Sequence, residues 1–206
     1  MKKNREKKKN PVIRTAFVFL VAFTVSCGGL YTVLCTGIAQ LFFPGKANGS
    51  IIEIDGKKYG STLLAQEFTG EEYLWGRIMN IDSETYTDDE GNIAVYSGPS
   101  NQSPAGEELE ALVAERVEKQ KEANPDMAGE KIPVDLVTAS GSGLDPEISP
   151  AAAKYQIARV AKARDMKAEE VRAIVEKYTT GRAFGVFGEP RVNVLKVNLA
   201  LDGILK

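Results

Sequence analysis

The residues best suited to chemistry form a short loop of serines and glycines ahead of a predicted helix that begins at Ser149 and Pro150. Backbone amides in such a loop could bind an anion or contact a partner. The loop lacks the Lys-Ser/Thr ending of a P-loop and the glycine spacing of a dinucleotide fingerprint. A tight turn would equally explain the glycines. The candidate contact residues are Ser140, Gly141, Ser142, Gly143 and Asp145.

A serine nucleophile in this loop is the main catalytic alternative. The sequence contains no histidine, which excludes Ser-His-Asp and Cys-His catalysis and most transition-metal sites. A serine–lysine pair would remain, with Lys154 or Lys162 as the base for Ser140 or Ser142. Paired acids such as Asp88 and Asp89 are better explained as solvated surface. We therefore expect no catalytic residue and no metal, and keep an external serine hydrolase or binding domain as the alternative.

The sequence around this loop predicts both strands and helices, so we expect an α+β domain over residues 46–206. A hairpin with an Asp-Gly turn is expected over 51–59, and the single tryptophan, Trp75, is expected in the core. A helix is expected from Ser103 and Pro104 to the break at Asn124 and Pro125. A half-buried strand is expected over 132–138, helices over 149–164 and 167–179, and an alternating strand over 191–201.

One apolar stretch organises the rest of the chain. The 31 residues from Thr15 to Gly45 contain no Asp, Glu, Lys or Arg, and a bilayer core needs about 20 helical residues. This pattern predicts a single transmembrane helix over residues 15–45. A cleaved signal peptide, which would release an external domain, is the alternative, but its apolar region spans only about 7–15 residues.

The charges that flank this stretch predict its orientation. Residues 1–14 carry seven basic side chains and one acidic side chain, and basic residues stay on the cytoplasmic side. The predicted localisation is a single-pass protein of the cell membrane, with a cytoplasmic tail over 1–14 and an extracytoplasmic domain over 46–206. The net charge of the whole chain is −2, so the net charge of the part after the tail is −8. This negative charge argues against nucleic-acid binding.

Small and weakly polar residues recur every four positions along the predicted helix. Such a stripe lets a second helix approach closely, although Gly and Thr are also common in membrane helices generally. The other faces carry large apolar side chains that suit lipid. The stripe consists of Thr24, Gly28, Thr32, Thr36 and Gln40, and we expect it to contact a partner helix.

Several long motifs in this chain resemble one known family. They are PVDLVTASGSGLDP at 133–146, ISP at 148–150, YQ at 155–156, RVAKAR at 159–164, GEPRVNVL at 188–195 and NLALD at 198–202. The sequence resembles KdpC, the C subunit of the bacterial Kdp potassium-transporting P-type ATPase, from about residue 28 to 202. It departs from the family pattern at Ile78–Asn80, at Pro99, and at Glu147, where histidine is common.

The resemblance implies a non-catalytic, single-span subunit of a potassium pump. Its implied partners are a potassium-translocating subunit, an ATP-hydrolysing P-type subunit and a very small subunit. The family is also described as a catalytic chaperone that raises the ATP affinity of the hydrolysing subunit, so ATP would act through the complex. Because the predicted topology leaves only residues 1–14 on the nucleotide side, we favour a role for the acidic domain at the extracellular mouth of the potassium-translocating subunit.

Overall fold

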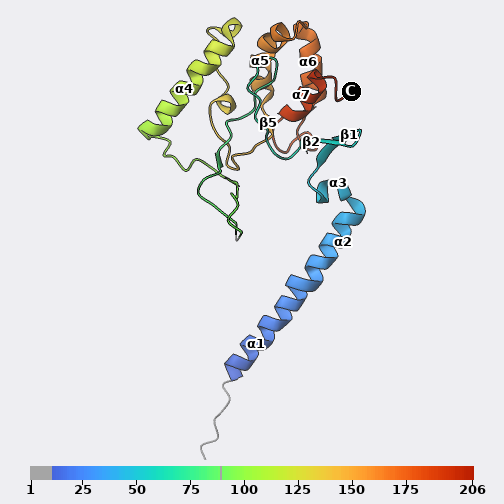
Figure 1. Ribbon diagram of the computed structural model, residues 1–206. Coiled ribbons are helices and arrows are strands. Elements are labelled where there is room, and N and C mark those ends of the chain that lie inside the picture. The colour runs from blue at the N-terminus through green and yellow to red at the C-terminus, as the bar shows by residue number, and fades with distance from the viewer. Residues whose placement is uncertain (1–10, 89) are drawn as a thin grey trace, which may run out of the picture. The chain divides into compact units, whose positions relative to one another are not determined.

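The computed structural model describes residues 11–88 and 90–206, which form two compact units. The first unit ends at Ser50, and the second runs from Ile51 to Lys206. Figure 1 shows a long helix in the first unit and a mixture of helices and short strands in the second. The predicted α+β composition of the second unit is confirmed.

One apolar helix dominates the first unit. It runs from Pro11 to Phe42, reaches a mean hydropathy of 2.0, and is long enough to cross a bilayer. It ends earlier than the predicted limit at residue 45, because Phe43 leaves the helical conformation ahead of Pro44. Most of the predicted basic tail falls on residues 1–10, outside the described residues. The helical parts are α1 (Pro11–Phe23), η1 (Thr24–Tyr31), α2 (Thr32–Phe42) and a short α3 (Pro44–Ala47).

Short antiparallel strands begin the second unit. The predicted hairpin is confirmed as β1 (Ile51–Ile54) and β2 (Lys57–Ser61). Asp55 and Gly56 both have positive φ, 53° and 75°, as a tight hairpin turn requires. A second pair, β3 (Ile81–Asp82) and β4 (Tyr96–Ser97), lies further along the chain.

The longest elements of the second unit are helices. The helix expected from Ser103 is α4 (Glu107–Ala123), which begins later because Ser103 and Pro104 lie in a turn and Gly106 is the N-cap. A 3-10 turn, η2 (Pro125–Met127), follows it. The two helices predicted next are confirmed as α5 (Pro150–Ala163) and α6 (Ala168–Lys177).

The strand predicted over 132–138 is wrong. Pro133 begins a 3-10 turn, η3 (Val134–Leu136), in which the Leu136 amide donates to the Pro133 carbonyl over 3.1 Å. Leu136 and Val137 are both buried, whereas consecutive strand residues would point to opposite faces. Burying both neighbours favours the turn over the strand.

The strand predicted over 191–201 is mostly wrong as well. Only β7 (Arg191–Asn193) is extended, and α7 (Val194–Leu201) follows directly. The Asn193 side chain caps this helix by accepting a hydrogen bond from the Lys196 amide over 3.0 Å. Because Asn198 is fully buried, the apparent alternation of apolar and polar residues does not mark an exposed face.

The core lies where α5, α6 and α7 meet a three-stranded antiparallel sheet. The strand order is β5 (Glu147–Ile148), β7 and β6 (Thr179–Thr180), with β7 in the centre. The largest of the fully buried side chains are Leu74, Leu136, Gln156, Val160, Val171, Val192, Val197 and Asn198. Two of these are carboxamides, and both of them hold the segment that positions the candidate loop.

Candidate functional site

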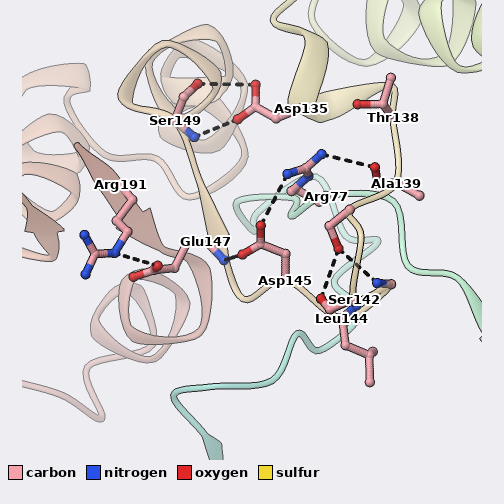
Figure 2. A network of polar contacts seen from close by, with 12 residues as sticks. Arg77, Asp135, Thr138, Ala139, Ser142, Leu144, Asp145, Glu147, Ser149 and Arg191 are labelled. Atoms are coloured by element: carbon pink, nitrogen blue, oxygen red, sulfur yellow. Dashed lines mark hydrogen bonds and ion pairs between the residues drawn. The ribbon is translucent and has the colours of Figure 1, made fainter. Parts of the chain in front are cut away.

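The two serines of the predicted contact loop hydrogen-bond within the loop. Their hydroxyl oxygens lie 3.2 Å apart, and each accepts from a backbone amide. The Gly143 amide donates to Ser140 Oγ over 3.0 Å, and the Leu144 amide donates to Ser142 Oγ over 3.2 Å (Figure 2). The described hydrogen bonds of these two hydroxyls involve no lysine. The catalytic serine–lysine pair is therefore not formed.

The two glycines of the loop differ in what surrounds them. Gly143 has φ +71°, and a Cβ added there would lie 2.6 Å from the backbone oxygens of Asn80 and Gly98. The Asn80 amide also donates to the Gly143 carbonyl over 2.9 Å. Around Gly141, no described atom lies within 4 Å of an added Cβ. Gly143 is therefore required by close packing of three backbone segments, and Gly141 is not.

Asp145 ends the loop and anchors it to Arg77. The Arg77 Nη1 nitrogen lies 3.3 Å from the Asp145 carboxylate, and Nη2 donates to the Ala139 carbonyl over 3.1 Å (Figure 2). Asp145 also accepts from the Glu147 amide over 3.0 Å. Arg77 therefore joins the two ends of the loop. Its Nε atom is buried and has no hydrogen-bond partner within the described part of the chain.

The N-terminus of α5 is occupied by the chain's own acceptors. Ser149 caps the helix by accepting from the Ala152 amide over 3.0 Å. The Asp135 carboxylate accepts from the Ser149 amide over 2.6 Å and from the Ser149 hydroxyl over 3.3 Å (Figure 2). An external anion would compete with this carboxylate at the positive end of the helix. A contact with a partner protein remains the prediction for the loop.

Two buried carboxamides hold the segment that carries Arg77. Asn198 of α7 accepts from the Leu74 amide over 2.8 Å and donates to the Leu74 carbonyl over 2.9 Å. Gln156 of α5 does the same for Trp75, over 2.9 and 3.1 Å. Sequence reasoning gave these residues no role. A polar residue on an otherwise apolar helix face is the signal that could have identified them.

Arg159 is a buried cation that the sequence did not predict as part of the site. Its guanidinium lies 4.3 Å from the centroid of the Trp75 ring. Its nitrogens donate to Asn124 Oδ1, Gln156 Oε1 and the carbonyls of Glu71 and Tyr73 over 2.6–3.2 Å. Burial lowers the pKa of Arg159 to about 10, which leaves it charged at neutral pH. Trp75 is half-buried and stacked on this cation, so the expectation of a tryptophan buried in the core is corrected.

A cavity of about 170 Å³ adjoins Trp75 and Arg77. Arg116 and Lys119 of α4 also line it, and Glu67 is the acidic residue of the lining. Arg116 donates to the Val137 carbonyl over 3.1 Å, and the Lys119 ammonium lies 5.4 Å from the Trp75 ring. This lining suits an anionic or aromatic group of a partner better than a cation.

The membrane-length helix presents its predicted stripe on an exposed surface. All five stripe residues are exposed, and an added Cβ at Gly28 meets no described atom within 4 Å. Two of the five already have polar partners: the Thr32 hydroxyl donates to the Cys27 carbonyl over 3.0 Å, and Gln40 exchanges two hydrogen bonds with Asn48. The stripe as a partner surface remains a prediction.

The π-helical segment η1 changes how the stripe is aligned. In a regular α-helix, four residues make slightly more than one turn, so a four-residue repeat drifts around the helix. In the wider π-helical turn, four residues fall short of one turn, and the drift reverses. The residues in η1 and those in α2 therefore drift in opposite directions, which keeps Thr24, Gly28, Thr32, Thr36 and Gln40 near one face.

Comparison with known proteins gives one consistent result. The family model for KdpC, the K+-transporting ATPase c chain, matches residues 13–203. The potassium-transporting ATPase KdpC subunit of Clostridium botulinum (strain Eklund 17B / Type B) is 60% identical over 195 residues, which cover 95% of this chain and 97% of that protein. The corresponding subunits of Clostridium perfringens (strain ATCC 13124) and Paraburkholderia phytofirmans (strain PsJN) are 58% and 47% identical, over 95% and 93% of this chain and 98% and 96% of theirs. The chain therefore belongs to the KdpC family, the C subunits of the potassium-transporting ATPase.

Proposed function

We propose that the chain is a non-catalytic accessory subunit of an ATP-driven, high-affinity potassium import complex, in which it supports assembly and activity. The observation that carries the proposal is the family match over residues 13–203, which covers nearly all of the membrane-length helix and of the second unit. The internal bonding of Ser140 and Ser142 supports a structural role for the loop. ATP hydrolysis would take place in another subunit.

The topology in this proposal rests on charge. The basic residues that precede the helix favour a cytoplasmic N-terminus and an extracytoplasmic C-terminal domain in the cell membrane. The partners are the potassium-translocating subunit, the ATP-hydrolysing P-type subunit and the small subunit, with lipid around the helix. ATP would reach this chain only through the complex, and any rise in the ATP affinity of the hydrolysing subunit would be transmitted through subunit contacts.

The acidic domain is proposed to act at the extracellular mouth of the potassium-translocating subunit. The part of the chain after residue 14 has a net charge of −8. A negatively charged surface beside a pore raises the local concentration of cations. Since this effect is electrostatic, it weakens as ionic strength rises.

A mild-detergent pull-down on the full chain tests the proposal. We expect the tagged chain to co-purify the other subunits, and deletion of its gene to abolish high-affinity potassium uptake. The isolated chain should show no ATP turnover. Normal uptake in the deletion strain would overturn the proposed role.

A further inference from the structure

The segment that joins β6 to β7 is a closed, pre-formed loop, here called the apolar finger (residues 182–189). Arg182 Nη2 donates to both carboxylate oxygens of Glu189, over 2.9 and 2.6 Å. The backbones of Ala183 and Phe187 exchange two hydrogen bonds of 2.8 and 2.9 Å. These contacts fix the shape of the loop before any partner binds, so less conformational entropy is lost on binding.

The finger exposes three large apolar side chains within four residues. Phe184 is 94% exposed, and Val186 and Phe187 are each 68% exposed. Single exposed apolar residues are ordinary on a protein surface, but a contiguous group marks a contact site.

The backbone of the finger is strained at the residue that is most exposed. Phe184 has φ 53°, in the left-handed region that bulky residues rarely adopt. Its neighbour Gly185, at φ 75°, could adopt such a conformation without strain. Since Phe184 is almost fully exposed, its side chain gains little from packing within its own domain. Strain of this kind is typical of segments shaped for a ligand or partner.

The charges around the finger favour a protein partner over a lipid surface. Arg182 is paired with Glu189, and Arg191 is paired with Glu147 over 2.7 Å. These pairs leave little free positive charge to attract anionic lipid. The finger contains Phe and Val but not the Trp or Tyr typical of membrane interfaces. Phe side chains are among those enriched at protein interfaces.

We propose that the apolar finger docks into an apolar pocket on another subunit of the potassium-transporting complex, with Phe184 and Phe187 as its anchors. The inference rests on the proposed function, because it needs the other subunits as partners. Anchors of this kind hold most of the binding energy of an interface.

Photo-cross-linking in the assembled complex tests the docking. A photoreactive phenylalanine analogue is placed at position 184 of the full chain, co-expressed with the other subunits, and activated in intact membranes. The control position is Val134, which is 68% exposed, the same fraction as Phe187. We expect cross-links to another subunit from position 184 and few from position 134. Cross-links from position 184 to lipid, or to a second copy of this chain, would overturn the docking.

A pair of variants provides an independent measurement. We expect Phe184→Ser with Phe187→Ser to lower co-purification of the other subunits roughly tenfold, with an unchanged melting temperature because both residues are exposed. The matched control is Leu63→Ser with Val134→Ser, which should co-purify as the wild type does. If the wild type co-purifies no subunit, the proposed function fails and the docking with it. If the wild type co-purifies but position 184 gives no cross-link, or the finger variant co-purifies normally, only the docking fails.

Discussion

The guanidinium of Arg159 lies 4.3 Å from the centroid of the Trp75 ring, and its described hydrogen bonds all go to neutral oxygens. A buried cation is stable only if many acceptors replace water. These acceptors belong to the segment around Glu71 and Tyr73, to Asn124 and to Gln156. Arg159 therefore fastens the segment that carries Arg77, and through Arg77 it supports the serine–glycine loop.

Arg159→Gln should destabilise the C-terminal domain by about 3 kcal/mol, because the carbonyls of Glu71 and Tyr73 and the Asn124 amide would lose a buried donor. The matched control is Arg172→Gln on the exposed face of α6, which should change stability by less than about 0.5 kcal/mol. Urea unfolding of the full chain in detergent measures both. Equal stabilities of the two variants would contradict the supporting role of Arg159.

Gly143→Ala should destabilise the chain by about 2–4 kcal/mol, since the new Cβ would lie 2.6 Å from two carbonyl oxygens at a φ of +71°. Gly141→Ala, two positions earlier in the same loop, should be nearly neutral because the space around it is open. Thermal unfolding compares the two variants. A large loss of stability in Gly141→Ala would contradict the assignment of the glycine requirement to Gly143 alone.

Local signals allowed the hairpin turn at Asp55 and Gly56 and the cap at Ser149 to be predicted, because each depends on residues close in the sequence. The segments 132–138 and 191–201 were predicted wrongly because their conformation depends on distant partners. Asn198 can be buried because its side chain hydrogen-bonds to the backbone of Leu74, which lies 124 residues away in the sequence. It accepts from the Leu74 amide and donates to the Leu74 carbonyl. Alternation in sequence could not reveal that pairing.

The candidate loop was found from its composition, but the roles of its residues were not. Gly141 and Gly143 look equivalent in the sequence, and only the approach of Asn80 and Gly98 separates them. The π-helical turn in η1 was also missed, because helix-face reasoning assumes a regular α-helix throughout.

Tyr155→Phe should reduce the loss of stability at alkaline pH. Burial raises the pKa of Tyr155 above its usual value of 10.0. The folded state therefore keeps the phenol proton after the unfolded chain has lost it, and the resulting stability, complete below pH 10, is lost as pH rises through the folded-state pKa. Urea unfolding at pH 8 and pH 11 should show a smaller decline for the variant than for the wild type. Tyr86→Phe, at an exposed tyrosine, is the control and should decline as the wild type does.

Gly28→Leu should weaken assembly through the membrane-length helix. Because η1 reverses the drift of the four-residue repeat, Gly28 lies near one face with Thr24, Thr32, Thr36 and Gln40, and a leucine there would fill the space into which a partner helix could pack. We expect roughly tenfold less co-purification of the other subunits in mild detergent. Cys35→Leu is the matched small-to-large control, since Cys35 is exposed and lies outside the stripe.

Thr32→Val should have little effect in the same measurement, because the Thr32 hydroxyl already donates to the Cys27 carbonyl of its own helix and has no further proton to donate to a partner. Close approach at Gly28, rather than hydrogen bonding at Thr32, would then be the determinant of helix association. Normal co-purification by Gly28→Leu, or an equal loss in Cys35→Leu, would show that the stripe is not the contact face. A loss in Thr32→Val alone would place the contact at the hydroxyl and contradict the role assigned to Gly28.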